Sequence, residues 1–216
     1  MSFEKINLTT VSKFSPNVIS ARCPHCGNES NFENAGISDI AGSNFIDGTN
    51  MGFRIGIRRC PRSACRGQLF FQTLGDSTAT YPVQRIDFDA SDVPENISKS
   101  FDEALSAQAN GLHIASAIMV RKTLELVCID RSAKGDNLSN RIKDLEKQIT
   151  LPKQLFTAMD NLRLLGNDAA HIESKIFDEI GDDEAKIAID LTKEILKAIY
   201  QLDSIVSRLE KLKSKK

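Results

Sequence analysis

The sequence predicts an α+β protein in which a small antiparallel β module at residues 1–91 precedes an all-α helical bundle at residues 92–216. Four of the five cysteines form two close pairs in the first part, each beside a segment of β-type alternation. After Pro94, glycine and proline become scarce and apolar residues recur at helical spacing. The chain has no tryptophan and only 6% aromatic residues, which favours a helical core of Leu, Ile and Ala.

Composition narrows the class of protein. The 216 residues are 41% hydrophobic and carry a net charge of −1, the profile of an ordinary water-soluble globular protein. No apolar run approaches the ~20 residues that a membrane-spanning helix needs. The first six residues lack the basic and then apolar layout of a signal peptide. We therefore expect a cytoplasmic protein without a membrane partner.

The strands of the β module are predicted by alternation of apolar and polar residues. Residues 1–16 are expected to be irregular, and residues 28–50, rich in Asn, Gly, Ser and Asp, to form a long loop. The predicted strands cover residues 18–22, 52–59, 68–74 and 81–88.

The cysteine pairs follow two of these strands. Two residues separate Cys23 from Cys26, and four separate Cys60 from Cys65. Each spacing can bring two sulfurs together in one turn, and in a reducing compartment such pairs favour metal ligation over disulfides. Four thiolates complete a tetrahedral shell, so we predict one structural Zn²⁺ per chain in a small zinc ribbon. His25 is the alternative ligand, but its position inside the first turn is expected to direct it away from the metal.

A run of positive charge surrounds the second cysteine pair. From Met51 to Phe70 the charged residues are all arginines: Arg54, Arg58, Arg59, Arg62 and Arg66. Two interpretations are open. The arginines are either solvent-exposed strand residues or a surface that contacts the phosphates of RNA or DNA.

The second part of the chain reads as a series of helices. The expected helices cover residues 94–110, 112–131, 137–149, 152–165 and a long segment from residue 182 onward. Asn137 is the expected N-cap of the third. The second is apolar around nearly its whole circumference, which indicates a central, buried helix.

Polar residues inside the bundle form a candidate site. Arg121 and Glu125 share one face of the central helix and need partners there. The stretch with Arg163, Gly166-Asn167 and His171 is the obvious supplier. Because Gly and Asn tolerate positive φ, Gly166-Asn167 is predicted to stop a helix that ends near Arg163, with His171 opening the next segment.

The Arg121–Glu125 segment, followed by Leu162–His171, resembles a known family, domain of unknown function 4145. This helical family is grouped with the HEPN superfamily, and the resemblance covers roughly residues 95–205. The preceding cysteine pairs look like the zinc ribbon often seen ahead of such domains. The resemblance implies a HEPN-like bundle, commonly dimeric.

The resemblance also implies a candidate reaction. In active HEPN ribonucleases an Arg and a His meet across the dimer and cleave RNA without a metal ion. The matching residues here are Arg163 and His171, with Asn167 as the alternative polar partner. A His of near-neutral pKa can deprotonate a 2′-hydroxyl group, and an Arg can hold the scissile phosphate.

Three hypotheses follow, of which the first is preferred. In the first, the protein is an interaction module acting on or near nucleic acid, in a setting such as anti-phage defence. Its bundle forms a homodimer, its ribbon contacts RNA, DNA or a protein partner, and its internal polar residues fix the angles between helices. In the second, it is a HEPN-type ribonuclease or toxin-like effector that uses Arg163 and His171. In the third, it is a nucleic-acid-binding adaptor that uses the arginine run.

Overall fold

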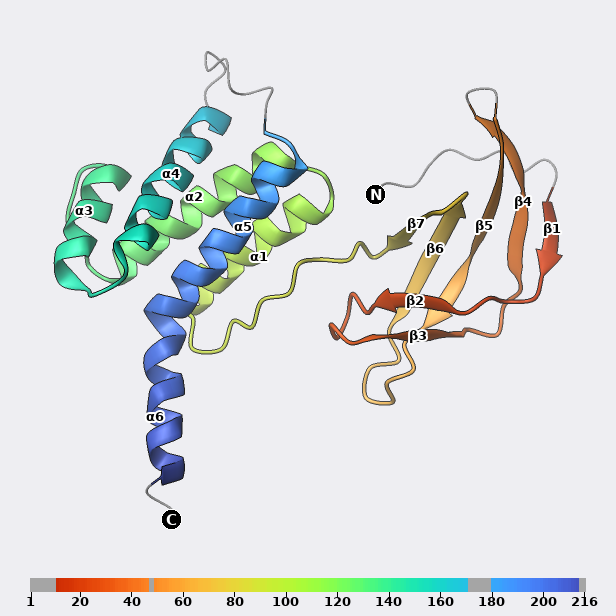
Figure 1. The fold of residues 1–216 in the computed structure, drawn as a ribbon, viewed down its shortest axis with the longest axis horizontal. Helices are drawn as coiled ribbons and strands as arrows, with labels where there is room; N and C mark the ends of the chain where they lie inside the picture. Colours follow the sequence, from red (N-terminus) through yellow and green to blue (C-terminus); the bar gives the residue numbers. More distant parts are fainter. Residues whose placement is uncertain (1–10, 47–48, 171–179, 214–216) are drawn as a thin grey trace. The chain divides into compact units, whose positions relative to one another are not determined.

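The computed structural model describes residues 11–46, 49–170 and 180–213 and confirms the α+β class. The chain divides into two compact units, Met1–Asp87 and Phe88–Lys216. The first consists of antiparallel strands and the second of helices (Figure 1).

The β unit is a sheet of antiparallel strands. Their bounds are β1 Val11–Phe14, β2 Ile19–Arg22, β3 Glu29–Asn34, β4 Asp39–Ile46, β5 Thr49–Arg59, β6 Gln68–Leu74 and β7 Ser77–Tyr81. The strand order is β1-β4-β5-β3-β2, and β6 pairs with both β5 and β7. The long β5 is thus the strand around which the sheet is built.

Several sequence-based expectations for this unit are wrong. The expected loop at residues 28–50 contains β3 and β4, and the expected irregular start contains β1. The last predicted strand, at residues 81–88, is replaced by β7, which ends at Tyr81. The polar residues of β4 form a strand because they pair with β5, for example Ser43 with Gly52 and Asn44 with Met51. Pairing with a neighbouring strand outweighs the low β propensity of Asn, Gly and Ser.

The helical unit follows the predicted order. The bounds are α1 Glu95–Ala109, α2 His113–Asp130, α3 Leu138–Gln148, α4 Lys153–Ala170, α5 Asp182–Leu196, a π-helix η2 Lys197–Gln201, and α6 Leu202–Lys213. The central α2 packs against α1, α3, α4 and α5. The side chain of Asn137 caps α3 by accepting a hydrogen bond from the backbone N–H of Asn140 at 3.0 Å.

The predicted helix stop at Gly166-Asn167 is wrong, because α4 continues through both residues to Ala170. A Cβ atom on Gly166 would lie 2.5 Å from the Cβ of Arg121 and 3.0 Å from the carbonyl oxygen of Ala117. The missing side chain therefore allows α4 to approach α2 closely. This glycine serves helix packing rather than a turn.

The segment expected as one long last helix consists of three elements, since η2 separates α5 from α6. Within η2 the side chains of Tyr200 and Gln201 are buried. The Tyr200 hydroxyl donates to Asp130 at 2.8 Å, and the Gln201 amide donates to the carbonyl oxygens of Asp89 and Ser91 at 2.6 and 2.9 Å. The π-helix thus joins the end of α2 and the chain before α1. Among the described residues, no helix combines the length and apolarity needed to cross a membrane.

Candidate functional site

Two turns of the β unit carry the paired cysteines. β2 leads directly to Cys23, and β5 leads directly to Cys60. In the first turn the N–H of Gly27 donates to the carbonyl oxygen of Cys23 at 2.9 Å. Gly27 has a φ of 69°, and Arg66, which follows the second pair as Gly27 follows the first, has a φ of 52°. Both turns therefore reverse the chain through a left-handed residue directly after their second cysteine.

The four cysteine sulfurs converge on one point. All four Sγ atoms lie within 4.8 Å of one another, with 3.8 Å between Cys23 and Cys65 and 3.9 Å between Cys26 and Cys60. A tetrahedral zinc–thiolate centre with Zn–S distances of about 2.3 Å would separate its sulfurs by about 3.8 Å. A disulfide would bring two of them to about 2 Å. The cysteines are free thiols with the spacing of a four-sulfur metal site.

His25 lies beside this cluster but is engaged elsewhere. Its Nε2 atom is 2.8 Å from the carbonyl oxygen of Gln68. A Cβ atom on Gly67 would collide with the His25 ring, so the glycine lets the ring lie against the second turn. The Gly67 N–H donates to the sulfur of Cys65 at 3.4 Å. This hydrogen bond lowers the Cys65 pKa, but burial and the neighbouring thiols Cys26 and Cys23 raise it overall. The geometry thus gives the candidate metal site four sulfur donors, with the imidazole outside them.

The environment acts differently on the individual thiols. Burial raises the pKa of Cys23 and of Cys60, because it disfavours the charged thiolate. The pKa of Cys26 is lowered to about 7, chiefly by the hydrogen bond from the backbone N–H of Asn28. A bound cation would favour the thiolate form at every ligand. The site therefore supplies the donor set of a closed, structural centre.

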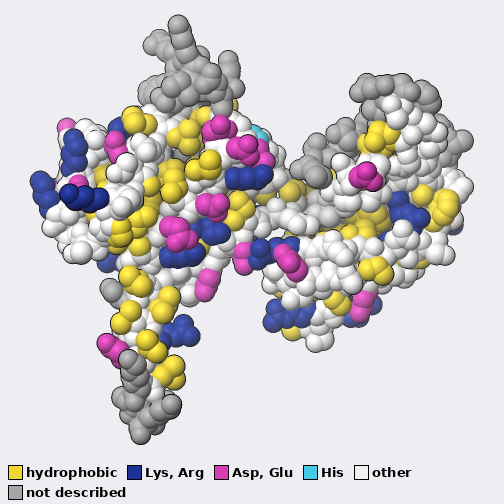
Figure 2. All heavy atoms as spheres, viewed as in Figure 1, with side chains coloured by type: hydrophobic (Ala, Val, Ile, Leu, Met, Phe, Trp, Pro, Cys, Tyr) yellow, Lys and Arg dark blue, Asp and Glu magenta, His cyan; other side chains and the backbone are white. Residues whose placement is uncertain are grey.

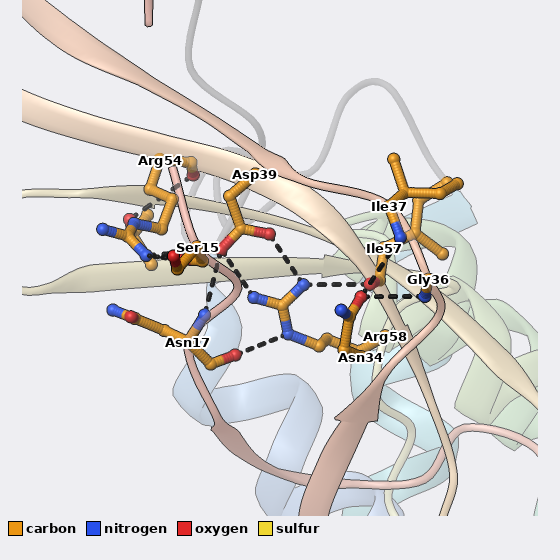
Figure 3. A network of polar contacts seen from close by, with 10 residues as sticks. Ser15, Asn17, Asn34, Gly36, Ile37, Asp39, Arg54, Ile57 and Arg58 are labelled. Carbon is orange, nitrogen blue, oxygen red and sulfur yellow. Dashed lines mark hydrogen bonds and ion pairs between the residues drawn. The ribbon is translucent and has the colours of Figure 1, made fainter. Parts of the chain in front are cut away.

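Arg58 lies in a different place from the one expected. Its side chain is 0% exposed, as is that of Asp39, and the two form a bidentate pair with distances of 2.8 and 2.7 Å (Figure 3). The Nε atom donates to the carbonyl oxygen of Asn17 at 2.7 Å, and the guanidinium lies 4.5 Å from the centroid of the Phe71 ring. The expectation that Arg58 faces solvent is therefore wrong. A buried guanidinium that is fully paired with a carboxylate cannot reach a phosphate.

Asp39 is the centre of this network. Arg54 Nη1 lies 3.3 Å from its Oδ2 atom, and the N–H of Asn17 donates to the same oxygen at 3.2 Å. Burial opposes ionisation of Asp39, but the hydrogen bonds and charge of Arg58, with the smaller contributions of Asn17 and Arg54, hold its pKa below the usual value. A Cβ atom on Gly56 would collide with the carboxylate. The network fastens the start of β4 to β5.

The other arginines of the run lie nearer the surface. Arg59 and Arg66 both pair with Glu33, at 3.5 and 3.3 Å, and Arg62 is exposed. Around the second cysteine turn, guanidinium groups therefore outnumber carboxylates. Of the five arginines, these three are placed where a phosphate could meet them.

The predicted polar residues of the bundle are brought together in part. Arg121 pairs with Glu125 at 3.2 Å along α2, and its Nη1 atom donates to the carbonyl oxygen of Arg163 at 3.1 Å. The side chain of Arg163 instead pairs with Asp160, one turn earlier on α4, at 2.7 Å. Arg121 thus joins α2 to the backbone of α4.

The remaining candidates follow Arg163 in the sequence. Asn167 is half-buried and lies one turn after Arg163. His171 lies outside the described residues, so its relation to Arg163 stays a prediction. Asp160 was missed by sequence reasoning, although its position three residues before Arg163 is a recognisable helical ion-pair spacing. Asp39 offered no such signal, because it belongs to an unpredicted strand.

Fold and site together define a two-unit α+β protein whose β unit carries a candidate four-cysteine metal centre. The family model described as domain of unknown function (DUF4145) matches residues 102–215, more than half of the chain, and the chain belongs to this family. The match confirms the family assignment that the sequence of the helical part predicts. No curated protein and no solved structure matches the chain.

Proposed function

We propose that this protein is an interaction module in which a zinc ribbon and a HEPN-like helical bundle act on or near nucleic acid. The observation that carries the proposal is the spacing of the four sulfurs, which supports the zinc centre. Cys23 lies 3.8 Å from Cys65 and Cys26 lies 3.9 Å from Cys60, measured between Sγ atoms. Because four thiolates fill the coordination sphere, the zinc has no position for a substrate and its role is structural.

The ribbon needs this metal because its apolar core is small. Cys23 and Cys60 are themselves part of the buried cluster, together with Phe32, Leu69 and Phe71. Small units with few buried apolar residues usually depend on a metal or on disulfides for stability. Metal analysis of the purified chain should find about one Zn²⁺ per chain, and removal of the zinc should unfold the β unit while the helical CD signal remains. A folded β unit after complete zinc removal would contradict this proposal.

Nucleic-acid contact is supported by the guanidinium groups of Arg59, Arg62 and Arg66, which outnumber the carboxylate of Glu33 at the second cysteine turn. A surface of this kind binds phosphates with little sequence preference, and its affinity falls as salt rises. Replacing Arg62 and Arg66 with Ala should weaken RNA or DNA binding and reduce the slope of log affinity against log salt by about 1 for each phosphate that is no longer neutralised. Lys99→Ala, an exposed change in the helical unit, is the matched control. Affinity that does not respond to salt would argue for a protein partner instead.

A ribonuclease is the second candidate function, favoured by the succession of Arg163 and Asn167 one turn apart on α4, just before His171. The assay is RNA cleavage by the zinc-loaded chain without added Mg²⁺, compared with His171→Ala. Cleavage that disappears in the variant at unchanged melting temperature would establish the nuclease. Absence of cleavage by the zinc-loaded wild type would support the interaction module.

A further inference from the structure

The last helix of the chain has an apolar face that the described part of the bundle leaves uncovered. Its five large aliphatic side chains are 46–67% exposed: Leu202, Ile205, Val206, Leu209 and Leu212. Figure 2 shows hydrophobic side chains along α6, which extends past the other helices of its unit in Figure 1. A contiguous apolar surface of this kind marks an interaction site.

The spacing of these residues indicates what covers them. Leu202, Ile205, Leu209 and Leu212 follow one another at intervals of three, four and three, the a/d spacing of a helix that packs against another helix. The series is symmetric about residue 207. When two copies of α6 lie antiparallel, Leu202 therefore meets Leu212 of the second copy and Ile205 meets Leu209, so that each layer is a pair of aliphatic side chains.

The charges of α6 favour a second copy over an anionic lipid surface. Between residues 202 and 213 the sequence has three basic and two acidic residues, and Lys215 and Lys216 follow. Amphipathic helices that bind anionic membranes are instead rich in Lys and Arg on their polar face. The two acidic residues of α6 lower its attraction to anionic headgroups and offer the basic residues of a second copy opposite charges to meet.

The available area also fits a pair of copies. The five half-exposed aliphatic side chains of α6 in each copy supply on the order of 1,000 Å² in total, about the size at which a specific interface begins.

We propose that α6 is a self-association surface through which two copies of the chain pair as antiparallel helices. This inference goes beyond the proposed function, because it requires neither zinc nor nucleic acid. The sequence-based expectation places the dimer contact in the bundle as a whole. This inference assigns the contact to the side chains of α6.

The test uses the full chain and measures its mass in solution at increasing protein concentration. The wild type should form a dimer. Ile205→Glu and Leu209→Lys each place an unpaired charge in an apolar layer, and each should weaken association on the order of 100-fold or more. Ile187→Glu, an equally exposed isoleucine on α5, should leave the dimer intact.

The two variants also test the antiparallel arrangement. In a mixture of Ile205→Glu and Leu209→Lys, the antiparallel pair places the introduced carboxylate against the introduced ammonium group in one layer. The other layer then again holds Leu209 against Ile205, so a mixed dimer should form. A parallel pair restores neither layer. A monomeric wild type, with or without binding to anionic vesicles, would overturn the proposal. So would a dimer that survives in both single variants, or a mixture that stays monomeric.

Discussion

Replacing Arg58 with Met should destabilise the β unit. Because the Arg58 side chain is buried, the change leaves the exposed side chains of the unit as they are. The change removes both ionic hydrogen bonds to Asp39 and the hydrogen bonds to the carbonyl oxygens of Asn17 and Ile57. The carboxylate of Asp39 then stays buried with Arg54 at 3.3 Å as its remaining cation. Its uncompensated charge is the source of the destabilisation.

The magnitude follows from this burial. Removing one partner of a buried ion pair costs roughly 3–5 kcal/mol, and the residual pairing with Arg54 places Arg58→Met near the lower end. Since small domains are stable by about 5–15 kcal/mol, this is a large part of the total. Replacing Asp39 with Leu in the same chain should recover most of the loss, because an apolar pair leaves no buried charge.

The assay is urea unfolding of the zinc-loaded chain, with zinc release as the signal of the β unit and CD as the signal of the helices. Arg58→Met should lower the midpoint of zinc release and leave the helical transition unchanged. Arg62→Met, an exposed arginine of the same run, should change stability by less than about 0.5 kcal/mol. If Arg58→Met left the midpoint unchanged but weakened nucleic-acid binding, the assignment of Arg58 to a buried structural network would be refuted.

Three other changes test separate parts of the structure. Gly166→Ala should destabilise the helices by about 1–3 kcal/mol in thermal unfolding, because the clash with Arg121 exceeds the roughly 1 kcal/mol gained in helix propensity; a raised melting temperature would contradict the close packing. Asp39 has a lowered pKa in the folded state, so its contribution is present above the unfolded pKa of about 3.9 and is lost as pH falls through the folded value. The stability difference between wild type and Asp39→Asn, measured by urea unfolding, should therefore be constant from about pH 7 to 5 and shrink below about pH 4, whereas a constant difference down to pH 3 would argue against the carboxylate. Cys60→Ser should lose zinc in metal analysis, and Cys128→Ser should retain it, since burial in the helical unit raises the Cys128 pKa to about 11 and keeps that thiol inert; equal zinc content in the two variants would rule out the cysteine cluster.

The features that the sequence predicts well are those set by nearby residues. α1, α2 and α3 begin and end within a few residues of their predicted bounds, because caps and helical period are local signals. The convergence of the two cysteine pairs was also predictable, although 33 residues separate Cys26 from Cys60. This prediction rests on a chemical rule and not on local sequence: a tetrahedral zinc ion needs four donors, so two pairs of cysteines are expected to meet.

The features that the sequence did not predict depend on distant partners. β3 has one buried apolar residue, Phe32, so its alternation is weak, and it becomes a strand through its neighbours β2 and β5. Gly166 reads locally as a helix stop, but its role is set by Arg121 on another helix. Arg58 reads as a surface charge until Asp39, from an unpredicted strand, is placed beside it. In each case a tertiary contact overrides a local preference.

The arginines also differ in how readily each could hold a phosphate. Releasing Arg58 would leave Asp39 buried without its main partner, at a cost of several kcal/mol. Arg163 is 16% exposed, but its partner Asp160 is half-exposed on the same helix, and a pair of this kind contributes only about 0–1 kcal/mol. Arg163 can therefore exchange Asp160 for a phosphate at low cost. Since Asp39 holds Arg58, the candidates for phosphate contact in the β unit are the arginines near the second cysteine turn. On α4, the ion pair with the half-exposed Asp160 leaves Arg163 available to a phosphate, as the ribonuclease hypothesis requires.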